Sequence, residues 1–238
     1  MLTNIRYIIL TALRDWLFAG LMLAVLACVL ISHMLGGIAL IENQEMTLAY
    51  ASMAARGVIV AGLIIFACFH VRNAFDTKEI DVFLSRPITR MNLVLSYWLG
   101  FATVSIGLVI PAVILIALQG VIDVNGFIFW SLSLLVECWL TVAISILAAF
   151  SIASPVTSAL VTLGIYIVAR MTGFFIAISS INPVFTNILP RIDFFAKSEW
   201  LIYGVKDNAD LKLFLLQAVI YIPILIFFAI AGFRRKQF

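Results

Sequence analysis

Six long apolar stretches constrain this chain more than any other feature of its sequence. A helix needs about 20 mainly apolar residues to cross the hydrocarbon core of a bilayer, and all six stretches reach that length. They run over residues 17–41, 49–71, 93–118, 127–150, 156–181 and 211–233. Ser154 and Pro155 separate the fourth stretch from the fifth, because serine followed by proline is typical of a helix start. We therefore predict an all-α, polytopic membrane protein with six transmembrane helices, folded as a single domain over 1–238.

The composition excludes the main alternatives to a membrane protein. Of the 238 residues, 64% are hydrophobic and 11% are charged, and soluble domains have roughly 25% charged residues. One soluble core cannot cover that much apolar surface, and disordered chains are poor in apolar residues. The formal net charge is only +3 and no dense basic run is present, so no nucleic acid partner is expected. We therefore expect membrane lipid to surround most of the chain.

The loops between the predicted spans differ in positive charge, and this difference predicts the orientation, because cytoplasmic loops carry an excess of lysine and arginine. With the N-terminus in the cytoplasm, nine positive residues lie inside and four lie outside. Those inside are Arg6, Arg14, Arg72, Lys78, Arg86, Arg90, Arg234, Arg235 and Lys236, and those outside are Arg191, Lys197, Lys206 and Lys212. We predict a multi-pass protein of the cell inner (plasma) membrane with both termini cytoplasmic.

Two further segments are not expected to cross the membrane. Residues 1–16 place Ile5, Ile8 and Ile9 at helical spacing beside charged residues, which favours an interfacial helix along the inner membrane surface. A plain N-terminal extension of the first span is the alternative. Residues 182–210, before the last span, mix charges with five aromatic residues and two prolines. Aromatic residues favour the boundary between water and lipid, so we expect short helices that rest on the outer leaflet or re-enter it.

The loop at 72–92 is the most informative part of the sequence. The charge count places it in the cytoplasm, and Ile80, Phe83 and Leu84 follow the i, i+3, i+4 spacing of a short amphipathic helix. Pro87 ends that helix, because the residue before a proline disfavours helical conformation. A short cytoplasmic helix between two spans can insert its apolar side chains into a groove on a partner protein. The alternative is a plain amphipathic connector.

The run VFLSRPITR, from Val82 to Arg90, resembles the cytoplasmic coupling segment of the ABC type-2 permease family, the membrane subunits of ATP-binding-cassette exporters. The positions that match the family pattern are Glu79, Phe83, Leu84, Pro87, Ile88 and Arg90. Residues 189–195 are similar to the outer segment that precedes the last helix in that family, and the order of the predicted elements is similar over the whole chain. The Gly-Thr pair that often precedes the coupling helix is absent, as is the lysine that often opens the third span.

The resemblance implies a coupling helix that docks on a separate cytoplasmic ABC ATPase, present in two copies, with a second copy of the permease or a paralogue beside this chain. The implied ATPase-coupling residues are Glu79, Phe83, Leu84, Arg86, Pro87 and Arg90. ATP and Mg²⁺ would bind the partner, since this sequence has no G-x-x-x-x-G-K-[ST] phosphate loop. On this interpretation the chain is a transport subunit rather than an enzyme, has no cofactor of its own, and exports a lipid-like or amphipathic substrate.

Four ionisable residues deep within the predicted spans matter most: His33, Arg56, Glu137 and Arg170. A charge at the centre of a membrane helix costs about 2.5–3.5 kcal/mol. Glu137 and Arg170 both lie roughly 15 Å below the outer surface at 1.5 Å per residue, so we predict an ion pair that acts as a structural clamp or, alternatively, as a substrate or proton site. Arg56 is placed near an outer helix end, where it can reach water or an anionic lipid headgroup. His33 is expected to be a packing residue or a pathway contact.

A second class of function remains open at this point. An ion- or proton-coupled secondary carrier would use Glu137, Arg170 and His33 and would need no ATPase. Against it stand the single acidic residue in the predicted spans and the absence of a clear internal repeat of the kind that many carriers have. An intramembrane enzyme is disfavoured, because the sequence has no H-E-x-x-H motif and no aspartate within a predicted span.

Overall fold

The computed structural model describes residues 2–38, 42–77, 89–174, 190–195, 197–205 and 208–235. All regular structure in this part of the chain is helical. The elements are α1 (Leu2–Arg14), α2 (Leu17–Gly36), α3 (Asn43–Asp76), α5 (Arg90–Ala117), α6 (Val124–Ser151), α7 (Pro155–Arg170), the 3₁₀ turn η1 (Ile192–Phe194), α10 (Glu199–Tyr203) and α11 (Asn208–Arg235). Five helices, namely α2, α3, α5, α6 and α11, are long and apolar enough to cross a membrane. The chain is therefore an all-helical, multi-pass membrane protein.

The predicted span at 156–181 is described only in part. Its helix α7 has 16 residues, about 24 Å at 1.5 Å per residue, which is shorter than the hydrocarbon core of roughly 30 Å. Residues 172–174 form a further helical turn, and residues 175–181 lie outside the described part. The count of six spans therefore stays a prediction.

Capping residues explain where three of the helices begin. Thr89, Asp123 and Ser154 each accept a hydrogen bond from the backbone N–H three residues later, at 3.3, 2.7 and 3.4 Å. Each bond satisfies one of the free N–H groups of a first helical turn. Pro155 occupies the first turn of α7, where its missing N–H costs nothing. The predicted separation of the fourth and fifth apolar stretches is confirmed.

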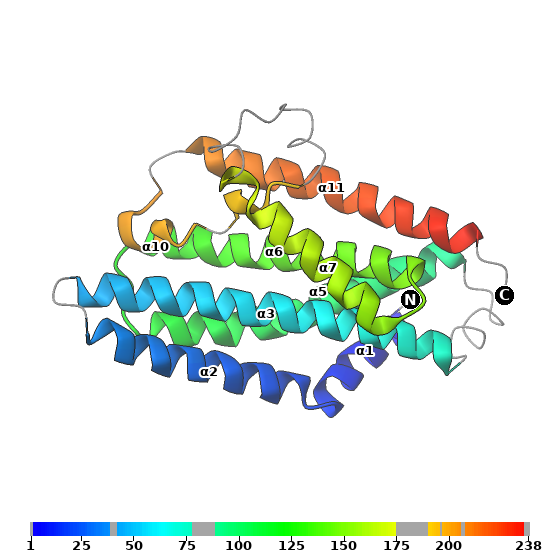
Figure 1. Ribbon diagram of the computed structural model, residues 1–238, viewed down its shortest axis with the longest axis horizontal. Helices are drawn as coiled ribbons and strands as arrows, with labels where there is room; N and C mark the ends of the chain where they lie inside the picture. The colour runs from blue at the N-terminus through cyan, green and yellow to red at the C-terminus, as the bar shows by residue number, and fades with distance from the viewer. Residues whose placement is uncertain are drawn as a thin grey trace.

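The long helices run side by side, with α6 in the interior of the bundle (Figure 1). In the most apolar stretch of α6, 78% of the residues are buried. The corresponding share in α2 is 11%, so α2 is peripheral. The two ends of the bundle differ. One end, called here the α1 end, carries α1, the end of α3, the start of α5 and the end of α11, and the other, the α10 end, carries α10 (Figure 1).

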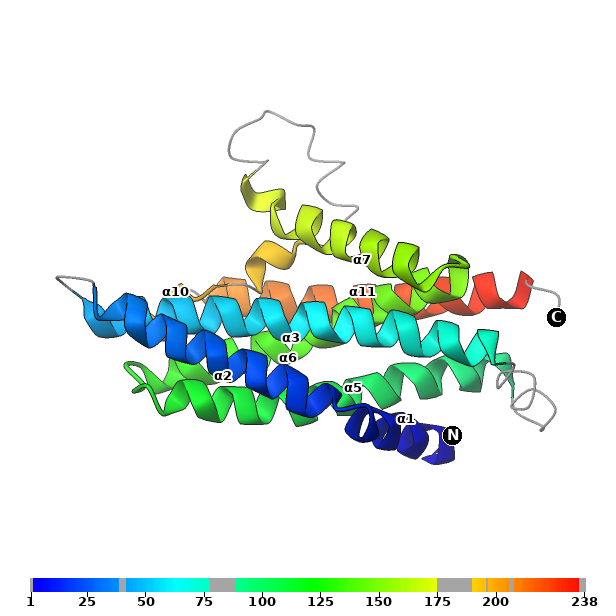
Figure 2. The same cartoon turned by 60° about the horizontal axis from the view of Figure 1, so that its bottom comes forward.

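The first helix, α1, is separate from α2, so the alternative of a plain extension of the first span is wrong. The chain turns between them at Trp16, whose φ of +56° is left-handed, and α1 points away from the axis of α2 in Figure 1. Figure 2 shows α1 at the same end of the molecule as the end of α11. The helix α1 packs on α5, where Asn4 Nδ2 donates a hydrogen bond of 2.6 Å to Ser96 Oγ. Gly100 of α5 allows this close approach, because Ile8 fills the space beside it.

We expect Gly100→Ala to loosen α1 from the bundle. The added Cβ would lie 2.6 Å from Ile8 Cδ1 and 3.2 Å from Ile8 Cβ, and overpacking of this kind costs about 1–3 kcal/mol. Thermal unfolding in detergent should show the loss, and trypsin should cleave faster after Arg14. Gly57→Ala is the control, because no atom lies within 4 Å of its added Cβ. An unchanged cleavage rate in Gly100→Ala would contradict the prediction.

Candidate functional site

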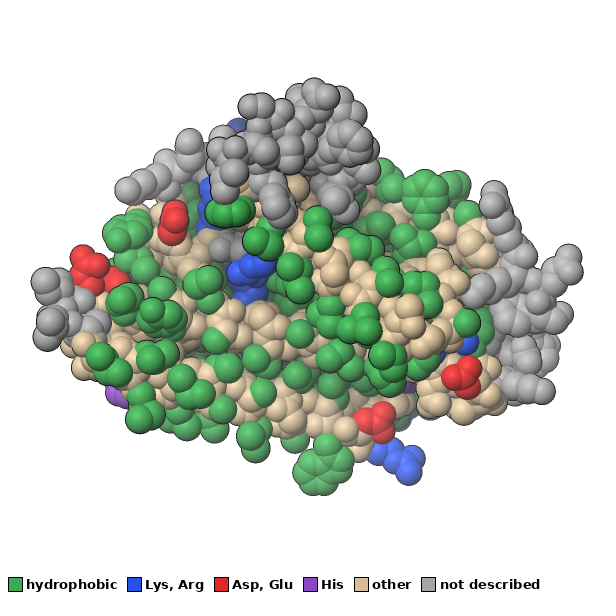
Figure 3. All heavy atoms as spheres, viewed as in Figure 1, with side chains coloured by type: hydrophobic (Ala, Val, Ile, Leu, Met, Phe, Trp, Pro, Cys, Tyr) green, Lys and Arg blue, Asp and Glu red, His purple; other side chains and the backbone are tan. Residues whose placement is uncertain are grey.

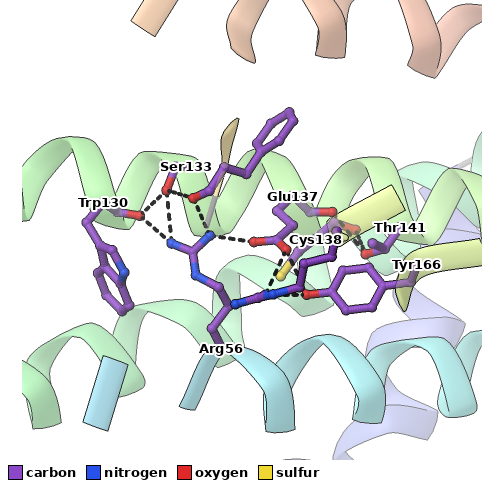
Figure 4. Close-up of polar contacts among 9 residues, drawn as sticks. Arg56, Trp130, Ser133, Glu137, Cys138, Thr141 and Tyr166 are labelled. Atoms are coloured by element: carbon purple, nitrogen blue, oxygen red, sulfur yellow. Dashed lines mark hydrogen bonds and ion pairs between the residues drawn. The ribbon is translucent and has the colours of Figure 1, made fainter. Parts of the chain in front are cut away.

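A cluster of charged side chains lies inside the bundle, where α3, α6 and α7 meet (Figure 4). Arg56 of α3 is 1% exposed and Glu137 of α6 is fully buried, and Arg56 Nη1 lies 2.5 Å from Glu137 Oε2. Tyr166 of α7 donates its hydroxyl to Glu137 Oε1 at 2.8 Å. Arg170 Nη1 donates to the Tyr166 hydroxyl at 2.9 Å and lies 3.8 Å from the same carboxylate oxygen. One buried carboxylate is thus shared by two arginines from two helices.

The guanidinium of Arg56 also binds the segment that precedes α10. Its Nη1 donates to the Phe195 carbonyl at 2.6 Å, and its Nη2 donates to Ser133 Oγ at 3.0 Å and to the Trp130 carbonyl at 3.4 Å. Ser133 Oγ lies 3.0 Å from the Phe195 carbonyl. The guanidinium carbon lies 5.3 Å from the centroid of the Trp130 ring, as expected for a cation–π contact. A single side chain therefore joins α3, α6 and the chain after η1 (Figure 4).

The expectation that Arg56 reaches water is wrong. α3 begins at Asn43, six residues before the predicted span, so Arg56 lies about 20 Å from the helix start rather than about 10 Å. At that depth it pairs with Glu137. The expected contact between Glu137 and Arg170 is present at 3.8 Å, but Arg56 is the closer partner. Sequence reasoning could have found this pair, because Glu137 is the one acidic residue of the predicted spans and a membrane arginine needs such a partner.

His33 lies apart from the buried cluster. It lines a hollow at the α10 end together with Asn43, Thr47 and Gln119. Thr47 precedes Arg56 by nine residues, which is roughly 13 Å along α3. The structure thus brings Arg56, Glu137 and Arg170 together and leaves His33 out. Among the described residues, no group of three or more His, Cys, Asp or Glu could hold a metal ion.

The α1 end is the second candidate site, because the predicted coupling segment begins and ends there. Three phenylalanine rings pack edge to face there: Phe75 of α3, Phe150 of α6 and Phe233 of α11. The ring centroid of Phe150 lies 5.5 Å from that of Phe75 and 5.0 Å from that of Phe233, and the centroids of Phe75 and Phe233 are 6.1 Å apart. Arg90, the first residue of α5, donates its Nη1 to the Phe233 carbonyl at 3.3 Å and lies over that ring. The helix ends on either side of residues 78–88 are therefore packed on two other helices.

Only one of the predicted ATPase-coupling residues falls in the described part of the chain, and that residue is Arg90. The others lie outside it: Glu79, Phe83, Leu84, Arg86 and Pro87. Of the predicted outer segment at 182–210, residues 190–195, 197–205 and 208–210 are described, the last three as the start of α11.

No model of a known protein family matches the sequence, and a search of curated proteins finds no match. The interpretation of both sites therefore rests on their geometry and on the sequence pattern at 79–90.

Proposed function

We propose that this chain is the membrane-spanning subunit of an ATP-binding-cassette transporter, of the ABC type-2 permease kind, which exports a lipid-like or amphipathic substrate. The observation that carries the proposal is the run VFLSRPITR at 82–90 with Glu79 before it, in the loop where such permeases have their coupling helix. Two copies of a separate ATPase would bind ATP and Mg²⁺ and dock on this segment in two permease chains. The coupling residues would be Glu79, Phe83, Leu84, Arg86, Pro87 and Arg90.

The proposal includes an orientation in the inner (plasma) membrane, with the α1 end and both termini in the cytoplasm. The distribution of charge supports it. Arg14, Arg72 and Arg90 lie at the α1 end, in keeping with the excess of lysine and arginine in cytoplasmic loops. In this orientation α1 lies along the inner membrane surface.

Two finer features of the topology belong to the same proposal. α7 and the residues that follow it form the sixth span. The segment around η1 re-enters the outer half of the membrane. The hydrogen bonds of the Phe195 carbonyl to Arg56 and Ser133 support this part, since these residues lie 13 and nine residues after the starts of α3 and α6 at the α10 end.

The packing at the α1 end supports a route from the ATPase to the membrane helices. The segment 78–88 leaves α3 just after Phe75 and enters α5 at Arg90, and both residues contact Phe233 of α11. Protein interiors are close-packed and only slightly compressible, so a displacement of the segment would move these helix ends together. α3 has 34 residues, about 51 Å, and carries Arg56 along its length. Movement of α3 would therefore reach Phe195 through Arg56.

Co-purification tests this proposal. The wild-type chain, isolated from its native host in mild detergent, is expected to bring an ABC ATPase with it. Leu84→Asp puts a charge on the apolar face of the coupling helix and should reduce the recovered ATPase by about tenfold or more, because central apolar anchors dominate such interfaces. Arg90→Glu should also reduce it. The matched control is Leu118→Asp, at a 78% exposed leucine of the α10 end, which should retain the ATPase.

Two outcomes would contradict the proposal. The first is a wild-type chain that purifies without an ATPase. The second is ATPase recovery that is the same in Leu84→Asp and in Leu118→Asp. The secondary carrier has less support, because His33 is remote from Glu137 and the carboxylate lies between two arginines.

A further inference from the structure

A hollow at the α1 end is lined by polar side chains, two of which are carboxylates. It has a volume of about 300 Å³ and lies between α1, α3 and the start of α7. Its polar lining consists of Thr11, Asp15, His70, Asn73 and Asp76. None of the described residues that line it is a lysine or an arginine. The lining therefore favours a positively charged ligand that donates hydrogen bonds.

His70 lines this hollow and carries an unpartnered nitrogen. Its Nε2 is shielded from solvent and has no hydrogen-bond partner in the described part of the chain. Buried polar nitrogens are almost always hydrogen-bonded in proteins. A neutral imidazole has one acceptor nitrogen. The ring of His70 can therefore receive one N–H when it turns toward the hollow, while the carboxylates of Asp15 and Asp76 receive others.

The remaining wall of the hollow is aromatic. Tyr7, Phe66 and Phe69 contribute their rings to it, and His70 lies 5.4 Å from the Phe66 ring and 6.0 Å from the Tyr7 ring between centroids. The faces of aromatic rings attract cations. Carboxylates, an imidazole acceptor and aromatic faces together form a site for a primary ammonium group, which offers three N–H donors.

We propose that this hollow binds the primary ammonium of an aminolipid headgroup, such as that of phosphatidylethanolamine. The surface around the hollow favours a lipid over a water-soluble amine. Tyr7 and Phe69 in its lining are 39% and 44% exposed, and the neighbouring turns of α1 expose Leu10 and Leu13 at 53% and 55%. An acyl chain therefore finds apolar surface beside the site.

Positive charge for the lipid phosphate is also close to the hollow. Arg14, the last residue of α1, precedes Asp15 and is exposed, and Arg72 is paired with Asp76 at 3.4 Å. Acidic and basic side chains lie together at this end of the molecule, among apolar ones (Figure 3). The inference is independent of ATP-driven transport and needs only the α1 end to lie at a membrane surface.

Lipid binding measured by native mass spectrometry on the full-length, detergent-purified chain tests this proposal. Four lipids with the same acyl chains are compared: phosphatidylethanolamine, its N-methyl and N,N-dimethyl forms, and phosphatidylcholine. Their headgroups offer three, two, one and no N–H donors. Retention should fall along this series. Phosphatidylethanolamine should be retained at least about tenfold over phosphatidylcholine, because the loss of even one hydrogen bond to a charged group weakens binding by about that factor. Equal retention of the four lipids would overturn the proposal.

Variants locate the site. The double variant Asp15→Asn with Asp76→Asn should bring the ratio of retained phosphatidylethanolamine to retained phosphatidylcholine close to one, and so should the single variant His70→Phe. The control is Glu42→Gln, at an exposed carboxylate of the α10 end, which should leave the ratio unchanged. The ratio is measured within one protein sample, so a loss of stability alone does not change it. An unchanged ratio in the double variant would overturn the proposal. So would displacement of phosphatidylethanolamine by an equal concentration of free ethanolamine, which would identify a water-soluble ligand.

Discussion

Replacement of Glu137 by glutamine is expected to lower the free energy of unfolding by about 3–5 kcal/mol, the cost of a buried charge left without its partner. The change keeps the shape of the side chain and removes the one carboxylate that Arg56 and Arg170 share. Arg56 is 1% exposed, so water cannot replace the lost charge. Unfolding by sodium dodecyl sulfate titration, or by heat in mild detergent, measures the effect.

Arg56→Met should cost less than Glu137→Gln, because Glu137 then keeps the Tyr166 hydroxyl at 2.8 Å and Arg170 at 3.8 Å. The double variant Arg56→Met with Glu137→Leu should also be more stable than Glu137→Gln alone, since it leaves no fully buried charge. Arg72→Gln is the control: its pair with the 63% exposed Asp76 should contribute at most about 1 kcal/mol. A double variant that is no more stable than Glu137→Gln would contradict this account of the cluster.

The second large effect is expected at Gly126, near the start of α6. A Cβ there would lie 1.7 Å from the Trp200 carbonyl oxygen and 2.8 Å from the carbonyl carbon. Both are backbone atoms, so α10 must move away from α6. We expect Gly126→Ala to cost about 3 kcal/mol, at the upper end of overpacking effects. Trp200 is 4% exposed, so its displacement should also shift tryptophan emission to longer wavelength.

Gly164→Ala in α7 is the matched control, because its added Cβ would have no atom within 4 Å. Alanine is the better helix former, so this change should be neutral or stabilise the protein by up to about 1 kcal/mol. Equal stabilities of Gly126→Ala and Gly164→Ala, with unshifted emission, would show that α10 is not packed on α6 as described.

Apolar patterning predicted the positions of most helices, because membrane helices must match the thickness of the bilayer. The stretches at 93–118 and 127–150 correspond to α5 (Arg90–Ala117) and α6 (Val124–Ser151) within three residues at each end. The start of α7 was also predictable, since Ser154 and Pro155 carry a local capping signal.

The buried cluster was predictable only in part. Hydropathy detects the apolar centre of a helix and not its polar ends, so the stretch at 49–71 underestimates α3 (Asn43–Asp76). That error placed Arg56 near the surface and hid its pairing with Glu137. The contact with Phe195 carries no sequence signal, because the acceptor is a backbone carbonyl 139 residues away in the chain. The site thus depends on how the chain folds back on itself, which no local pattern encodes.

Arg56 is synthesised long before the groups that neutralise it. Glu137 follows it by 81 residues and the Phe195 carbonyl by 139. At about 5–20 residues per second, the ribosome reaches Glu137 roughly 4–16 s after Arg56. During that interval the nascent α3 carries an uncompensated guanidinium, and its insertion costs about 2.5–3.5 kcal/mol. α3 therefore carries this cost until α6 is made, and the Phe195 carbonyl becomes available to Arg56 only after a further 58 residues.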